Sequence, residues 1–98
     1  MGPSLGRLRR LNVAKNLLGQ GGEAPLRWLA GLAQLEELDV SGNRLTSLSG
    51  VQRLRALRRL TAVGNEVGDQ RPLLALRKRG VAVQADAAQL RQLLWNLL

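Results

Sequence analysis

The chain has 98 residues, of which 45% are hydrophobic, so it can form one small domain with a core near the lower size limit for independent stability. It contains no His and no Cys, which removes the commonest general base, the best side-chain nucleophile, disulfides and thiolate metal sites. The net charge of +8, from 13 Arg and 2 Lys against 7 acidic residues, favours anionic partners, although GC-rich coding also enriches Arg, Ala, Gly and Leu.

These features exclude several classes of function. No window holds 18 consecutive apolar residues, so we expect no transmembrane helix and no membrane partner. We expect no enzymatic activity, no cofactor and no metal, because the usual catalytic side chains are absent and the acidic residues are few. A secreted domain of this size usually carries disulfides, so we expect an intracellular, cytoplasmic location.

The first element is a short pattern, Leu8-Arg-Arg-Leu11-Asn-Val13-Ala-Lys-Asn16-Leu-Leu18. Its apolar residues come first three apart and then two apart, which fits neither a helix nor a plain strand. We interpret it as a short strand that turns sharply at the Asn. The long interval that follows suits a return helix with Pro25 in its first turn. Three apolar residues recur on one face of that helix at spacings of three and four: Leu26, Leu29 and Ala33.

The second copy of the pattern is Leu35-Glu-Glu-Leu38-Asp-Val40-Ser-Gly-Asn43-Arg-Leu45. A shorter interval follows it. In that interval Leu48, Val51 and Leu54 recur every three residues, which predicts a 3₁₀ turn.

The third copy is Leu57-Arg-Arg-Leu60-Thr-Ala62-Val-Gly-Asn65-Glu-Val67. We predict another return helix over residues 69–79, with Pro72 in its first turn and Leu73 and Leu76 facing inward. Gly80 ends this helix.

A weaker fourth copy covers residues 81–86, with Asp86 at the Asn position. The Asn positions are then 27, 22 and 21 residues apart. Asp86 with Gln89 reads as a helix N-cap and capping box, and a helix over 86–98 would cover the end of the array. The predicted division is therefore repeats over 1–85 and a capping helix over 86–98. The alternative use of that helix is partner docking, because two apolar residues extend its surface: Trp95 and Leu98.

At the other end, residues 1–6 offer no capping element. Leu8, Leu11 and Val13 would then present an uncovered edge strand, which is a liability for a protein by itself. We therefore expect a fragment or truncated product of a longer array.

Three in-register matches to one pattern over nearly all of the chain resemble the leucine-rich repeat proteins. The resemblance implies an α/β solenoid, a right-handed superhelix with parallel strands on its concave face and helices or 3₁₀ turns on its convex face. The long first interval is similar to the class typified by ribonuclease inhibitor, and the second to the 22-residue class of intracellular scaffolds.

The resemblance also sorts the residues by role. The repeated Asn residues are interpreted as a structural ladder at the ends of the strands: Asn16, Asn43 and Asn65. The variable positions on the concave face are candidates for binding a protein, and in a parallel stack Glu37 would lie between Arg10 and Arg59. That candidate surface comprises Arg10, Asn12, Lys15, Glu37, Asp39, Ser41, Arg59 and Thr61.

A second group of candidates is basic. Two clusters are expected to lie near each other on the side or back of the array and could contact phosphate: Arg53, Arg55 and Arg58, with Arg77, Lys78 and Arg79. No aromatic residues alternate with them, so stacking on bases is not supported.

The favoured hypothesis is a protein–protein interaction module, a scaffold or adaptor with another protein as partner. Two alternatives remain open. One is a basic accessory subunit that contacts nucleic acid in a ribonucleoprotein. The other is a regulatory repeat segment that acts on a GTPase or a phosphatase.

Overall fold

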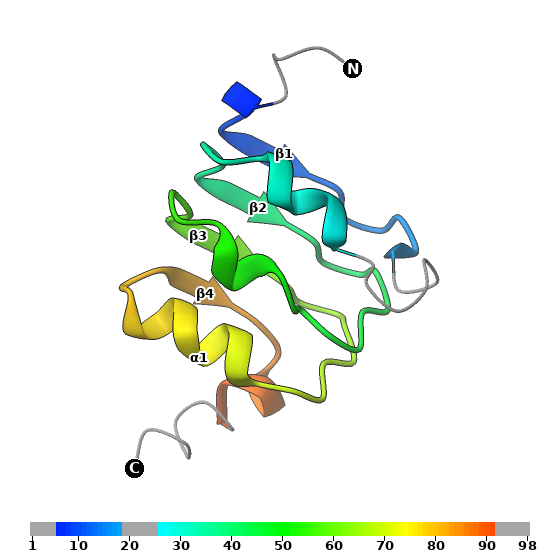
Figure 1. Cartoon of the computed structure of the whole chain (residues 1–98). Helices are drawn as coiled ribbons and strands as arrows, with labels where there is room; N and C mark the ends of the chain where they lie inside the picture. Colours follow the sequence, from blue (N-terminus) through cyan, green and yellow to red (C-terminus); the bar gives the residue numbers. More distant parts are fainter. Residues whose placement is uncertain (1–5, 19–25, 92–98) are drawn as a thin grey trace.

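Four short strands form a single parallel sheet in chain order in the computed structural model, which describes residues 6–18 and 26–91. The strands are β1 (Arg10–Asn12), β2 (Glu37–Asp39), β3 (Arg59–Thr61) and β4 (Ala82–Gln84). The return segments carry η3 (Arg27–Gly31), η4 (Val51–Arg53) and α1 (Arg71–Lys78), which lie one above another along one side of the sheet (Figure 1). This arrangement confirms the expected α/β repeat fold in outline.

The register of the sheet places equivalent repeat residues side by side. Leu11 pairs with Leu38, Leu38 with Leu60, and Leu60 with Val83. These central residues face the return segments. Because side chains alternate along a strand, the residues on either side of each central one point to the opposite, outer face of the sheet.

The core is one layer between the sheet and the return segments. It consists almost entirely of Leu and Val, as the scarcity of aromatic residues requires. Leu38 and Leu60 enter it from the strands, and Leu29, Leu48 and Leu73 enter it from the other side. Each fully buried Leu contributes about 1.5–3 kcal/mol of transfer free energy, so the repeated leucines hold the repeats together.

The first return segment differs from the predicted helix. It forms the 3₁₀ turn η3, and in and around this turn Leu26, Leu29, Leu32 and Leu35 are buried at a constant spacing of three, whereas Ala33 is exposed. A 3₁₀ helix has three residues per turn, so this spacing keeps all four leucines on one side. The inward position assigned to Ala33 was therefore wrong, and Pro25 lies outside the described residues.

The second return segment confirms its prediction. Leu48, Val51 and Leu54 are all buried around the 3₁₀ turn η4. Successive main-chain hydrogen bonds of the i to i+3 type link these residues, from the Val51 N–H to the Leu48 carbonyl and from the Leu54 N–H to the Val51 carbonyl. The first two return segments therefore share one three-residue period.

The third return segment contains the helix α1, as predicted. Pro72 lies in its first turn, and Leu73 and Leu76 are fully buried. Gly80, with φ of 85°, ends it in a Schellman motif, since the Gly80 N–H donates to Arg77 and the Val81 N–H donates to Leu76.

The fourth strand has a different register from the one predicted. Because Val83 pairs with Leu60, the residue equivalent to Asn65 is Ala88, and Asp86 aligns with Val63. Val81 is buried, but as the residue after the helix-ending Gly80 and not as the central residue of the strand. The placement of Asp86 at the Asn position was wrong for this reason.

Asp86 nevertheless closes the end of the third repeat. Its main-chain carbonyl accepts from the Leu90 N–H, which begins a helix seen over residues 87–91. Its carboxylate accepts from the Gly64 N–H at 3.0 and 3.2 Å. Within the described residues, the hydrogen bonds of the carboxylate thus run to the neighbouring repeat and do not form a capping box. The remainder of the predicted capping helix, residues 92–98, lies outside the described residues.

Candidate functional site

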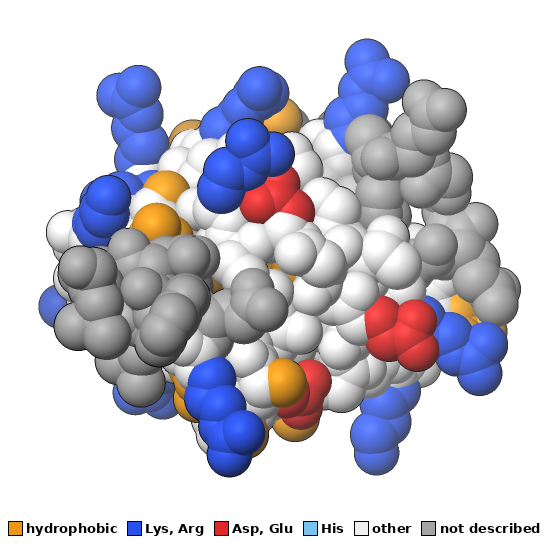
Figure 2. Space-filling view, turned by 90° about the horizontal axis from the view of Figure 1, so that it is seen from below, with side chains coloured by type: hydrophobic (Ala, Val, Ile, Leu, Met, Phe, Trp, Pro, Cys, Tyr) orange, Lys and Arg blue, Asp and Glu red, His pale blue; other side chains and the backbone are white. Residues whose placement is uncertain are grey.

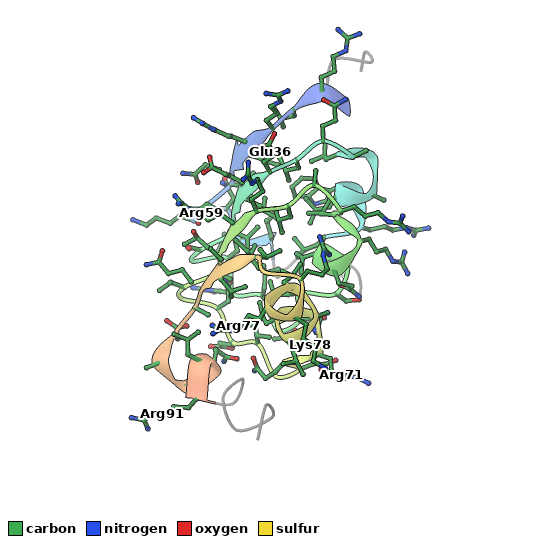
Figure 3. The ribbon with its side chains drawn as sticks, turned by 90° about the vertical axis from the view of Figure 1, so that its left-hand side faces the viewer. Glu36, Arg59, Arg71, Arg77, Lys78 and Arg91 are labelled. Carbon is green, nitrogen blue, oxygen red and sulfur yellow. The ribbon has the colours of Figure 1, made fainter. Side chains whose placement is uncertain are left out.

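Two periodic arrangements occupy opposite ends of the same strands. Charged side chains alternate in sign at the beginning of the strands. Just after the strands end, asparagine side chains form hydrogen bonds with main-chain groups of the neighbouring repeat. Figure 3 shows Glu36 and Arg59 at the sheet, well apart from Lys78 and Arg91 near the other end of the molecule.

The strand row comprises Arg10, Glu37 and Arg59 on three neighbouring strands. The Glu37 carboxylate lies 2.9 Å from the Arg10 Nε and 3.8 Å from an Arg59 guanidinium nitrogen. The predicted position of Glu37 between two arginines is confirmed. Each acidic group is shared by two cations because the parallel register stacks equivalent positions directly beside one another.

A second row lies one residue earlier, and the sequence interpretation missed it. The edge row comprises Arg9, Glu36 and Arg58, with the Glu36 carboxylate 3.5 Å from Arg9 and 3.9 Å from Arg58. The doubled residues at equivalent places, Arg-Arg, Glu-Glu and Arg-Arg, were the available signal. We refer to the strand row and the edge row together as the charged rows.

Main-chain bonds hold these doublets in place. The Glu36 and Glu37 N–H groups both donate to the Arg9 carbonyl, at 2.7 and 2.9 Å. The Arg58 and Arg59 N–H groups donate in the same way to the Glu36 carbonyl, at 2.7 and 3.0 Å. The backbone, and not the ion pairs, therefore sets the positions of the charged rows.

The charged rows line a hollow of about 410 Å³, together with Ala82. A second hollow of about 360 Å³ continues along the strands and is lined by the strand row and by Asn12, Asp39 and Thr61. Between 66% and 83% of each arginine side chain is exposed, against 33% and 38% for the two glutamates. Such exposed pairs contribute about 0–1 kcal/mol to stability, and the two rows together carry a surplus of two positive charges.

The other predicted residues of this face differ in their availability. Asn12 and Asp39 each accept, through a side-chain oxygen, the N–H of the residue two positions later, at 3.0 and 2.9 Å. These turns shape the ends of their strands. Ser41 is half-buried as a residue, and its Oγ atom is buried. Lys15 is exposed and has a φ of 61°, in the turn where later repeats have glycine.

The asparagine ladder centres on Asn43, which is completely buried. Its Oδ1 accepts the N–H groups of Asn16 and Leu18 in the preceding repeat, at 2.7 and 3.3 Å. Its Nδ2 donates to the carbonyls of Val13 and Val40, at 2.9 and 2.8 Å. One amide thereby satisfies backbone groups of two repeats at the point where they leave the sheet.

The neighbouring asparagines make part of the same set of bonds. Asn65 is buried, accepts from the Asn43 and Leu45 N–H groups, and donates to the carbonyls of Val40 and Ala62. Asn16 is exposed, and its amide donates within its own repeat, to the carbonyls of Val13 and Ala14. These contacts are structural, and burial leaves the amides of Asn43 and Asn65 unavailable to a ligand.

The two basic clusters, which were predicted to lie near each other, meet only in part. Arg58 joins the edge row, and Arg79 donates through its guanidinium to the carbonyls of Gln52 and Leu54, both at 2.8 Å. Arg79 does therefore reach the second turn, where Arg53 lies. Viewed from the end that carries α1, Lys and Arg side chains project separately around the rim (Figure 2). All six residues of the two clusters are exposed, namely Arg53, Arg55, Arg58, Arg77, Lys78 and Arg79.

A family model described as leucine rich repeat matches residues 6–67, which include the first three copies of the pattern. The chain belongs to the leucine-rich repeat family. No curated protein matches the chain in a comparison of sequences. Leucine-rich repeat domains are generally protein-interaction modules and are generally not enzymes. Within the described ranges, the leucine-rich repeats contain no helix that is both long and apolar enough to cross a membrane.

Proposed function

We propose that this leucine-rich repeat chain is a scaffold or adaptor module that binds another protein through the outer face of its sheet. The strongest support is the register of the first three strands. This register places polar side chains from neighbouring strands side by side around the two hollows. The side chains on the inward face of these strands pack into the core. Substitutions on the outer face of the sheet therefore cost less stability than substitutions on the inward face.

We also propose a solenoid architecture, with the outer face of the sheet on its concave side. The repeat of 27 residues followed by one of 22 supports a mixture of a long, ribonuclease-inhibitor-like class and a short class. The third spacing, measured between Leu60 and Val83, is 23 residues. In this proposal the module has no chemistry of its own and acts inside the cell.

The test is a matched pair of variants, each adding one positive charge. Thr61→Lys places a long side chain on the outer face in β3, and Ser49→Lys places the same group on the opposite side, beside η4. A partner identified by cross-linking in cell extract is purified, and its Kd for each variant is measured by titration calorimetry. We expect Thr61→Lys to weaken binding about tenfold or more and Ser49→Lys to leave it within about twofold.

Circular dichroism spectra of both variants control for folding. A partner that binds Thr61→Lys as tightly as the natural chain, or that is lost equally with Ser49→Lys, would contradict the proposal.

A further inference from the structure

The charged rows carry the same order of charge twice. Across the first three strands, both rows read positive, negative, positive. Each glutamate is shared by two arginines, so each arginine keeps most of its five N–H donors for other acceptors. The guanidiniums are held near their carboxylates and yet remain largely exposed, with 83% of the Arg10 side chain accessible.

We propose that the charged rows recognise an extended segment of a partner protein in which two acidic residues flank a basic one. This proposal rests on the protein-binding function proposed above and adds the chemistry of the partner. Acidic side chains would contact Arg10 and Arg59, and the basic side chain would contact Glu37. Arginine suits this role because its planar fork binds a carboxylate through two parallel hydrogen bonds.

The spacing of the strands sets the spacing of the charges. Neighbouring strands lie about 4.8 Å apart, so the arginines of β1 and β3 are anchored about 10 Å apart. An extended segment advances about 3.3 Å per residue. A segment that crosses the strands therefore matches both arginines when its acidic residues are three positions apart, with the basic residue between them.

Because of Glu36 and Glu37, the charged rows should bind nucleic acid less tightly than a peptide of alternating charge. A phosphate backbone is uniformly negative and would meet repulsion from Glu36 and Glu37 in the middle of both rows. The charged rows hold no aromatic residue on which a base could stack. An alternating segment meets attraction at all three positions, and a wrong order of charges meets repulsion.

The experiment uses the full chain and two fluorescein-labelled peptides of equal composition in a Gly-Ser background. One contains Asp-Ser-Lys-Asp, and the other contains the permuted order Lys-Asp-Asp-Ser. Fluorescence polarisation at low salt is expected to show about tenfold or more tighter binding of the first peptide. Arg10→Gln with Arg59→Gln should reduce its affinity by a similar factor. The matched control, Arg53→Gln with Arg55→Gln, removes the same charge from exposed positions elsewhere and should leave the preference intact.

A second variant tests the central contact. Glu37→Gln should abolish the preference for a lysine between the acidic residues, whereas Glu66→Gln, the same change at an exposed residue outside the rows, should preserve it. Equal binding of the two peptides would overturn the proposal, as would tighter binding of an RNA duplex that the Arg10 and Arg59 changes abolish.

The two proposals fail in different ways. If neither peptide binds while Thr61→Lys still releases the identified partner, the charge pattern is wrong and the interaction surface stands. If Thr61→Lys leaves the identified partner bound, the interaction surface itself is wrong.

Discussion

The asparagine ladder and the charged rows are built by the same repeats at opposite ends of the same strands, but burial gives them opposite roles. Asn43 is fully buried and its amide bonds backbone groups of two repeats. Glu37 also bridges neighbouring repeats, but its partners are side chains that are mostly exposed to water.

This difference shows how a small repeat protein separates folding from recognition. A polar group that replaces lost backbone partners in the interior cannot change without leaving buried donors and acceptors unpaired. A polar group at the surface competes with water, so its identity can vary at little cost in stability. Periodicity alone therefore does not distinguish a structural ladder from a binding surface.

The largest expected effect comes from breaking the ladder at its centre. Asn43→Ala should lower the free energy of unfolding by about 3 kcal/mol, because buried N–H and carbonyl groups of two repeats lose their partner. Urea denaturation followed by circular dichroism measures this change. Asn43→Asp keeps the acceptor but turns a carboxylate toward the Val13 and Val40 carbonyls, so it should also destabilise. A loss within about 0.5 kcal/mol for Asn43→Ala would mean that water replaces these bonds easily.

A smaller effect is expected at the first rung of the ladder. Asn16→Ala should cost about 1 kcal/mol or less, since the Asn16 amide is exposed and donates to Val13 and Ala14 in its own repeat. The same denaturation experiment measures it beside Asn43→Ala. Equal losses for the two variants would remove burial as the cause of the difference.

Much of the fold could be predicted because the pattern repeats. Stacking of repeats places equivalent residues side by side. Copies in register therefore predict the first three strands, their parallel order and the position of Glu37 between two arginines. The 3₁₀ turn after the second copy follows from leucines spaced by three. The first return segment has the same spacing of three, but Ala33 also fits a helical spacing. For this reason a helix was predicted there instead of a 3₁₀ turn.

The other errors have separate causes, and the first is the weakness of the fourth copy. The residues at 81–86 fit the pattern in two ways, and only the pairing of Val83 with Leu60 decides between them. The edge row was missed because Arg9, Glu36 and Arg58 precede the strands, where alternation gives no orientation. The burial of the Ser41 hydroxyl depends on the turn geometry, which the repeat pattern does not specify.

A still smaller effect is expected for the charged rows. Glu37→Gln should change the free energy of unfolding by about 0.5 kcal/mol or less at low salt, because the pair partners are exposed. The difference should shrink further at 1 M salt, where charges are screened beyond about 3 Å. Parallel denaturation series at both salt concentrations measure this. A loss approaching that of Asn43→Ala would assign the charged rows to stability and weaken their assignment to recognition.

The smallest expected effect concerns an exposed pair formed within one turn instead of across strands. The Arg71 guanidinium donates to the Asp69 carboxylate at 2.8 to 3.1 Å, and the Arg71 main-chain N–H donates to it at 3.0 Å. The side-chain bonds, followed by the main-chain bond, lower the pKa of Asp69 from its ordinary value of 3.8 to about 2.

A carboxyl group whose pKa is lower in the folded state stabilises the fold at pH values above its unfolded pKa and loses that contribution as it is protonated. The contribution of Asp69 should therefore be complete above about pH 4 and disappear as the pH falls toward 2. Carboxyl carbon shifts measured by NMR give the titration midpoint directly. Arg71→Ala should raise it toward 3.8, whereas Arg77→Ala, which removes a cation later in α1, should not. An unchanged midpoint in Arg71→Ala would show that Arg71 does not lower the pKa of Asp69, and that this exposed pair does not form in solution.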